Sequence, residues 1–270
     1  MNPIIYLNSD FKNVYDDFRT FSRIKDKFKI YIERQDFIKD INLKIIKVKL
    51  PPNINENAYM ENIKRVKKHV REKNVFLAPK TYRPLDYKLY NEFEKNLFGF
   101  SVVNSSKLIL RTNHKSIRNS CIVLFDASES IIQRVVHYLA IEARYVVLVS
   151  KDLKSIKTIQ EYVSANFGTS MISTNDLSYS LENADLLITT KQIEVETNIP
   201  VWYLNNLNEP LNKSAFAIND VSFNVPWEFY ENEMPLEVLG ALLSQMDEKD
   251  IEKSLDYNNI SISNIGYRKY

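Results

Sequence analysis

Glycine is scarce in this sequence. It supplies four of the 270 residues, where an average usage of roughly 7 % predicts about 19. A loop that wraps a phosphate depends on glycine, because a residue without a side chain lets the backbone turn tightly and approach the ligand. The scarcity therefore argues against functions that need a glycine-rich phosphate loop.

Cysteine and histidine are also rare. The single cysteine, Cys121, cannot form an internal disulfide, which favours a reducing compartment, and it opens an apolar run as a small core residue does. The three histidines, His69, His114 and His137, are far apart and form no Cys/His cluster with metal-ligand spacing. We therefore predict no metal site. No histidine has an identifiable acid or nucleophile partner, so no catalytic residue is nominated.

Long apolar runs are absent as well. None approaches the ~20 residues that a membrane-spanning helix needs. The start, MNPIIYLNSD, has neither the basic segment nor the apolar stretch of a signal peptide. The remaining composition, 44 % hydrophobic and 26 % charged, is typical of a globular protein. We therefore expect no membrane association and a cytoplasmic location.

Charge is unevenly distributed along the chain. Residues 1–120 carry 25 basic and 13 acidic residues, a net +12, whereas residues 121–270 carry 11 and 21, a net −10. This asymmetry favours attraction between the two parts or an acidic partner for the first part. The overall richness in isoleucine, lysine and asparagine is also what an AT-rich genome produces. The basic run Lys64–Lys73 lies opposite the apolar face of its own predicted helix, and no nucleic-acid-binding motif accompanies it. A nucleic-acid partner is therefore not favoured.

Segments with strand and helix character alternate along the first hundred residues. Apolar runs predict strands at Pro3–Leu7, Phe28–Ile32, Leu43–Leu50 and Val75–Leu77. The spacing of apolar side chains predicts helices at Phe11–Lys27, Glu56–Lys73 and Leu85–Leu97.

The alternation becomes regular from residue 121. Strands are predicted at Cys121–Phe125, Arg144–Val149, Met171–Ser173, Asp185–Thr189, Val201–Leu204 and Ala215–Ile218. Helices are predicted at Glu129–Glu142, Leu153–Phe167, with Gly168 as its C-cap, and Asp176–Asn183. Strands that alternate with one-sided helices predict a parallel sheet with right-handed crossovers.

The predicted architecture is α/β with three segments. A smaller α/β domain occupies residues 1–105, and the parallel-sheet domain occupies residues 106–225. A helical tail at residues 226–270, with helices expected over Glu231–Asp256, packs back on the first domain.

The stretch from Ile122 to Thr190 resembles the NAD(P)-binding Rossmann domain of shikimate dehydrogenases and glutamyl-tRNA reductases. The resemblance lies in the order of a buried strand, a tight turn, a helix ending in YLAIEAR, the strand VVLV and the later segment LENADLLITT. It covers about a quarter of the chain and implies a Rossmann-like domain of the kind that binds NAD(P). The first half of the chain shows no substrate motif of either family.

The phosphate fingerprint G-x-G-x-x-G of that domain is lost here. Its three glycines fall on Asp126, Ser128 and Ile131, and a fourth falls on Glu142. Those glycines make the tight turn, admit the pyrophosphate and allow close helix–strand packing. Asp126 and Glu129 instead put carboxylates at the helix N-terminus, where they would satisfy the helix dipole and repel a pyrophosphate.

Eight residues are the candidates for contact with a cofactor: Asp126, Ala127, Ser128, Glu129, Ser150, Lys151, Thr189 and Thr190. Ser150 and Lys151 follow the second strand, where they suit the 2′-phosphate of NADP or are simply an exposed strand end. Thr189 and Thr190 finish the fourth strand, where β-branched residues are also ordinary.

The segment Asp126–Ser130 also reads D-x-S-x-S after an apolar strand. This pattern resembles the metal-ion-dependent adhesion site of von Willebrand factor A domains, which holds Mg²⁺ through oxygen ligands. Such a site needs a threonine and a later aspartate, for which Thr189 or Thr197 and Asp220 are loose candidates. The same residues also make an ordinary helix start.

Three hypotheses about function follow. The leading one is a relative of NAD(P)-dependent dehydrogenases without a cofactor, which acts as a binding, scaffold or regulatory protein in a bacterial-type cytoplasm. Its partner is a protein or a small-molecule ligand, and a homodimer is left open. The alternative is an NAD(P)H-dependent oxidoreductase with an atypical phosphate loop, using NADP through Ser150 and Lys151. The third is the Mg²⁺-binding adhesion-site-like domain.

Overall fold

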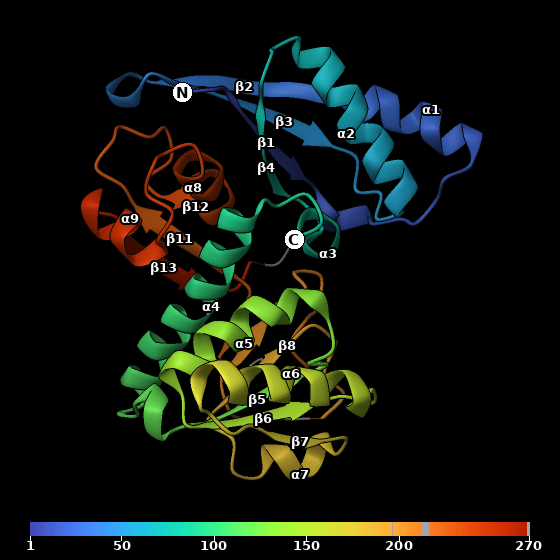
Figure 1. Cartoon of the computed structure of the whole chain (residues 1–270). Coiled ribbons are helices and arrows are strands. Elements are labelled where there is room, and N and C mark those ends of the chain that lie inside the picture. The colour runs from blue at the N-terminus through green and yellow to red at the C-terminus, as the bar shows by residue number, and fades with distance from the viewer. Residues whose placement is uncertain (196, 212–215, 269–270) are drawn as a thin grey trace. The chain divides into compact units, whose positions relative to one another are not determined.

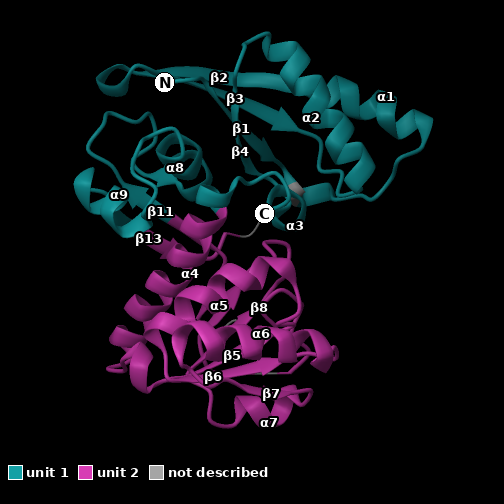
Figure 2. Cartoon of the chain, in the orientation of Figure 1, with its two compact units in different colours: residues 1–94, 222–263, 270 teal, residues 95–221, 264–269 magenta. Residues whose placement is uncertain are grey.

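The chain forms two compact units in a computed structural model that describes residues 1–195, 197–211 and 216–268 (Figures 1 and 2). Unit 1 contains Met1–Glu94 and Ser222–Ser263, and unit 2 contains Lys95–Val221 and the segment that starts at Asn264. The predicted domains 1–105, 106–225 and 226–270 remain a prediction. The two compact units divide the chain at other positions.

Unit 1 is built on a four-stranded sheet with the order β2-β3-β1-β4. Its strands are β1 (Ile4–Ser9), β2 (Tyr31–Ile38), β3 (Leu43–Leu50) and β4 (Phe76–Lys80). β1 pairs in parallel with β3 and β4, and β2 is an antiparallel edge strand. The helices of this part are α1 (Thr20–Lys29), α2 (Glu56–Val70) and α3 (Arg83–Asp86), with short 3-10 helices η1 (Phe11–Asn13) and η2 (Lys39–Ile41). α2 buries Tyr59, Ile63 and Val66 in the same core as Ile5 and Ile46 of the sheet.

The predictions for the first hundred residues need three corrections. The helix predicted at Phe11–Lys27 begins at Thr20, and the strand predicted at Phe28–Ile32 is displaced to Tyr31–Ile38. That strand lies at an edge with most side chains exposed, so it carries no apolar alternation. The helix predicted at Leu85–Leu97 is instead the short α3 followed by α4 (Glu92–Thr112).

The full length of α4 was not predicted from apolar periodicity, because buried residues lie on several of its faces. They include Phe93, Leu97, Val102 and Ile109, and also polar Ser101, Ser105 and Ser106. A helix that is buried on several faces lacks the single apolar stripe from which helices are predicted. Within the described residues, no helix is both long enough and apolar enough to cross a membrane.

Unit 2 is built on a six-stranded sheet with the order β10-β9-β8-β5-β6-β7, and every adjacent pair is parallel. The strands are β5 (Cys121–Phe125), β6 (Tyr145–Val149), β7 (Ile172–Thr174), β8 (Leu186–Thr189), β9 (Val201–Tyr203) and β10 (Ala217–Ile218). The helices are α5 (Ser130–Glu142), α6 (Leu153–Phe167) and α7 (Leu177–Leu181), and η3 (Ile117–Asn119) precedes β5. Numbered along the chain, the strand order is 3-2-1-4-5-6, which defines the doubly wound Rossmann arrangement. The predicted Rossmann-like sheet is confirmed.

Local signals explain why unit 2 was predictable. β5 and β6 are continuous apolar runs in which three of the five residues are buried. The side chain of Asp152 accepts a hydrogen bond from the backbone N–H of Ser155 and so caps α6. Gly168 ends that helix with a φ of 65°, as predicted. For the strand predicted at Ala215–Ile218, Ala215 itself lies outside the described residues.

The tail is less helical than predicted. It contains α8 (Leu236–Leu243) and α9 (Ile251–Tyr257), but also β12 (Met234–Pro235) and β13 (Ser261–Gly266), which form a sheet with β11 (Asp220–Asn224) in the order β12-β11-β13. The half-exposed residues of β13 give no clear apolar alternation, so sequence periodicity did not reveal it. The expected return to the first part of the chain is confirmed, because α8 contacts β1 and β4.

Candidate functional site

The first candidate site lies where the order of the parallel strands reverses. β5 and β8 are neighbours in the sheet, and Phe125 pairs with Thr189 at their carboxyl ends. In open α/β sheets, ligands bind in the crevice beyond this point, because the crossover connections leave in opposite directions there. The loop that starts at Asp126 and the loop that starts at Thr190 therefore define the place where a dinucleotide would bind.

Asp126 makes the turn that the first glycine of the fingerprint usually makes. Its φ is 64°, in the left-handed region. The backbone N–H groups of Asp126 and Ala127 both donate to the carbonyl of Val149, at 2.8 and 3.1 Å. Aspartate tolerates this backbone better than most residues, because its short polar side chain can bond locally. The turn is thus preserved without glycine, and a carboxylate is added to it.

The Asp126 carboxylate is buried and already has partners. Its Oδ2 lies 3.0 Å from Nζ of Lys191 and accepts a hydrogen bond of 3.3 Å from Oγ1 of Thr190. Both partners belong to the loop after β8, so the two loops of the crevice are joined across it. A pyrophosphate needs backbone N–H groups and a positive field. The residues present here do not fit that group, since a buried carboxylate stands at its position.

The side chains of two serines, one after β5 and one after β6, lie close together beside this turn. The Oγ atoms of Ser128 and Ser150 lie 3.2 Å apart, within hydrogen-bond distance. Ser150 is buried, its Oγ accepts from the N–H of Asp152 and its N–H donates to the carbonyl of Thr174. Because Ser150 is engaged on each side, it offers nothing to a 2′-phosphate. Lys151 is exposed, and no ion pair joins it to another described residue.

The remaining sequence candidates shape the two loops. Thr189 is fully buried, and its Oγ1 donates to the carbonyl of Lys191 and accepts from the N–H of the same residue. The carbonyl of Thr190 accepts from Nδ2 of Asn208. Glu129 is the N-cap residue of α5, but its exposed side chain makes no capping hydrogen bond. The expected interaction of Glu129 with the helix N-terminus therefore has no hydrogen bond behind it and stays a prediction.

The adhesion-site interpretation receives no support from the geometry. Asp220 lies 2.7 Å from Nε of Arg268, so it has its own cation, as Asp126 has Lys191. Oγ1 of Thr197 accepts a hydrogen bond from the N–H of Ile199. Among the described residues there is no group of three or more His, Cys, Asp or Glu side chains able to hold a metal ion.

Cys121 and His137 have the character of packing residues. Burial and the nearby Asp185 carboxylate raise the pKa of the Cys121 thiol, which disfavours the reactive thiolate. Burial and Arg134 lower the pKa of His137, whose ring lies edge-on against Tyr138. The sequence analysis nominated no catalytic residue, and these surroundings do not make either Cys121 or His137 a candidate.

A second cluster of polar side chains, which sequence reasoning missed, is buried in unit 1. Oδ1 of Asp86 accepts hydrogen bonds from the hydroxyls of Tyr59 and Thr81, both at 2.6 Å, and Oδ2 accepts from the N–H of Thr81 at 2.7 Å. Burial raises the pKa of the Asp86 carboxyl, although these hydrogen bonds and Arg83 act in the opposite direction. Burial and the Asp86 carboxylate also raise the pKa of Tyr59, so its hydroxyl stays a donor.

An ion pair near this cluster involves the tail. Nζ of Lys80 lies 3.8 Å from Oε2 of Glu237, and only 4 % and 2 % of the two side chains is exposed. Buried titratable groups of this kind mark functional sites and structural ion pairs alike. The only sequence signal was a lysine that ends the short apolar segment before Thr81. No spacing argument links that lysine to a glutamate more than 150 residues later.

Comparisons with known proteins add little at the level of sequence. No protein-family model matches the chain. No curated protein matches it either.

Several solved structures align with most of the chain at low identity. The ligand-free 5-ketofructose reductase of Gluconobacter sp. strain CHM43 is 11 % identical with a TM-score of 0.40, covering 96 % of this chain and 93 % of that one. The shikimate 5-dehydrogenase of Listeria monocytogenes, in complex with shikimate and NAD, is 7 % identical with a TM-score of 0.40, covering 96 % and 92 %. The L-tryptophan dehydrogenase of Nostoc punctiforme is 12 % identical with a TM-score of 0.41, covering 94 % and 76 %. Similarities of this size carry no argument about activity, and the fold assignment rests on the strand order of unit 2.

Proposed function

We propose that this protein is a cofactor-free relative of the Rossmann dehydrogenases, which acts as a binding or regulatory protein. The observation that carries the proposal is the Asp126–Lys191 ion pair in the crevice between the loops after β5 and β8. This pair stands where the backbone of a dinucleotide-binding protein receives the pyrophosphate. The proposed setting is the cytoplasm, with a protein or a small molecule as partner.

The expected repulsion between the Asp126 carboxylate and a phosphate is large. Two like unit charges about 4 Å apart repel by about 4 kcal/mol at an effective dielectric constant of 20. Asp126 therefore opposes a phosphate strongly, and Lys191 offsets that repulsion without leaving a positive surplus. A crevice that is neutral in sum lacks the attraction that normally holds a pyrophosphate at a helix N-terminus.

The rival function is an NADP-dependent oxidoreductase with an atypical loop. One observation favours it: Lys151 is exposed at the carboxyl end of β6, where NADP-binding proteins place a cation near the 2′-phosphate. The internal hydrogen bonds of Ser150 count against it. No proton donor for hydride chemistry is identified in the crevice.

Calorimetric titration with NADH and NADPH, up to millimolar concentration, tests the proposal. We expect no binding heat for the wild-type chain. Asp126→Gly removes the carboxylate and restores the first glycine, so we expect this variant to gain measurable binding. Glu129→Gln is the matched control, because it removes an exposed carboxylate from the same loop and leaves the ion pair intact.

Micromolar binding by the wild-type chain would overturn the proposal. A preference for NADPH that disappears in Lys151→Ala would then establish the rival. If neither cofactor binds to any variant, Asp126 is not what prevents binding, and the loss of the other fingerprint glycines is the cause.

A further inference from the structure

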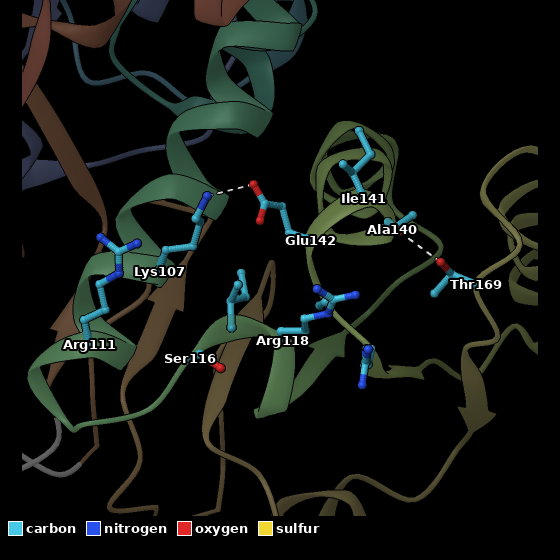
Figure 3. A pocket seen from close by; sticks show the side chains of 11 residues that line it. Lys107, Arg111, Ser116, Arg118, Ala140, Ile141, Glu142 and Thr169 are labelled. Carbon is cyan, nitrogen blue, oxygen red and sulfur yellow. Dashed lines mark hydrogen bonds and ion pairs between the residues drawn. The ribbon is translucent and has the colours of Figure 1, made fainter.

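One hollow of unit 2 lies at the end of its parallel sheet where β5 and β6 begin. Its volume is about 530 Å³, within the range of small-molecule sites. It is lined by the end of α4, by η3 just before β5, and by the segment between α5 and β6 (Figure 3). Because these segments precede β5 and β6 while Asp126 follows β5, the hollow is separate from the crevice and goes beyond the proposed function.

Positive charge dominates the lining of this hollow, which we call the arginine pocket. Lys107 and Arg111 come from α4, Arg118 from η3, and Arg144 directly precedes β6. The acid among its described lining residues is Glu142, whose Oε1 lies 2.7 Å from Nζ of Lys107 (Figure 3). Four cations against one acid leave a surplus of three positive charges.

The three arginines have no counter-ion within the described chain. Arg111, Arg118 and Arg144 are exposed, and none of them takes part in an ion pair or side-chain hydrogen bond there. The C-terminal end of α5 also faces the pocket and carries a partial negative charge equivalent to roughly −0.5. Because that is far smaller than the surplus, the helix end does not offset the charge of the three arginines that line the pocket.

Guanidinium groups recognise one chemistry best. Each presents a planar fork of N–H donors that matches two oxygens of a carboxylate or a phosphate, and a surplus of three positive charges favours the more highly charged phosphate groups. Oγ of Ser116 lines the same pocket with no hydrogen-bond partner among the described residues, so it adds a neutral donor. Ile141 also lines the pocket and is largely exposed, so it adds an apolar side chain to the charged ones.

We propose that the arginine pocket binds a small oligophosphate, of the size and charge of a triphosphate or nucleoside triphosphate. Its phosphate groups are held by Arg111, Arg118 and Arg144, and the apolar part of a nucleotide lies against Ile141. The volume of about 530 Å³ suits a compact ligand better than an extended polymer, because a nucleic acid backbone is followed by a continuous groove.

Binding of inorganic tripolyphosphate and of ATP to the full chain is the test, by calorimetry at low and at physiological salt. We expect saturable binding that weakens as salt rises. The double variant Arg111→Gln/Arg118→Gln should weaken it at least tenfold, since it removes several charge-assisted hydrogen bonds. The matched control Lys154→Gln/Lys157→Gln removes the same charge from exposed positions of α6 and should change affinity less than threefold.

A gain of affinity completes the test, because a folding defect cannot produce it. Glu142→Gln removes the pocket's acid and frees Lys107, so tripolyphosphate should bind severalfold tighter. Thermal melts of every variant show whether it is folded. No binding of either probe, an equal loss in the control variant, or unchanged affinity in Glu142→Gln would each overturn the proposal. Tighter binding of duplex DNA than of tripolyphosphate, lost in the same arginine variant, would overturn it in favour of a nucleic acid.

Discussion

Asp126 combines two features that seldom occur together, a left-handed backbone and a buried acidic side chain paired with a lysine. The backbone conformation is strained for most residues and easier for aspartate. The carboxylate gains Lys191 and Thr190 from the next loop. Lys191 itself is 57 % exposed, so water solvates it when the pair is broken. The two partners therefore contribute unequally to stability.

This inequality predicts an asymmetric effect of substitution. Lys191→Ala leaves a buried carboxylate without its cation and should lower the free energy of unfolding by about 1–2 kcal/mol. Asp126→Asn leaves only an exposed lysine and keeps a residue that tolerates positive φ, so it should cost about half as much. Urea denaturation measures both. Equal losses, or a larger loss for Asp126→Asn, would contradict the assignment.

Asp86 is the second residue whose surroundings set its behaviour. Burial raises its pKa above the ordinary value of about 3.9, so the folded state holds the proton to a higher pH than the unfolded chain does. The protonated carboxyl therefore contributes stability that is present below the unfolded pKa. That contribution is lost as pH rises through the folded pKa.

Comparison of wild type with Asp86→Asn isolates this contribution. The difference in unfolding free energy, wild type minus variant, should fall as pH rises from about 4 towards the raised pKa and then level off. Chemical denaturation at several pH values gives the difference directly. A difference that rises with pH in this window would show that the native carboxyl has a lowered pKa instead.

Tyr59→Phe probes the same cluster through a hydrogen bond. The variant removes the donor 2.6 Å from Oδ1 of Asp86 and should cost about 1.5–3 kcal/mol, because the acceptor is buried. The control is Tyr31→Phe, whose side chain is exposed on an edge strand and should change stability by less than about 0.5 kcal/mol. Equal effects in urea denaturation would argue against a role for the Asp86 cluster in stability.

At the scale of elements, α4 and α5 approach each other closely at one of the few glycines. A Cβ built on Gly99 would lie 2.8 Å from the backbone carbonyl carbon and oxygen of Arg134, closer than such atoms come in real structures. The helices pack at that distance because no side chain separates them there. A glycine-poor chain thus keeps a glycine where a helix crossing needs it.

Gly99→Ala should therefore destabilise the protein although alanine favours helices. The gain in helix propensity is about 1 kcal/mol, and forcing two backbones apart costs about 1–3 kcal/mol. We expect a net loss of up to about 2 kcal/mol, measured as a lower melting temperature. Asn104→Ala in the same helix is the control and should be neutral or stabilising. A Gly99→Ala protein that melts higher would show that α4 and α5 can separate freely.

Some helices and strands were predictable from the sequence and others were not. α6 was predictable from its inward residues and its Gly168 C-cap, and β5 from its continuous apolar run, because each signal is local. β2 and α4 were not, since an exposed edge strand and a helix buried on several faces both lack a one-sided pattern. Prediction from sequence thus succeeded where burial leaves a simple local pattern, either a one-sided helix or a continuous apolar strand.

At the scale of the whole molecule, unit 1 is discontinuous. All eight residues of α8 are buried, and the helix contacts β1 and β4. The ion pair of Lys80 with Glu237 lies in the same region. The first part of the chain therefore depends on a segment that follows it by more than a hundred residues.

A fragment of residues 1–105, the first predicted domain, should not fold alone. Without α8, the sheet would expose the apolar surface of β1 and β4 that this helix covers. We expect no cooperative thermal transition by circular dichroism for the fragment, with the full chain as the control. A cooperative transition would support the predicted domain boundary over the compact unit.

Two features were predictable from the sequence alone: the parallel Rossmann-like sheet and the loss of the phosphate-loop glycines. Both are written in local patterns, namely the periodicity of apolar side chains and the residue type at each turn position. Three other features are visible only in the folded chain. Asp126 pairs with Lys191, Asp86 is buried among hydroxyls, and three arginines line one pocket. These features join residues that are remote along the chain, and their energies depend on burial and distance, which chain folding alone creates.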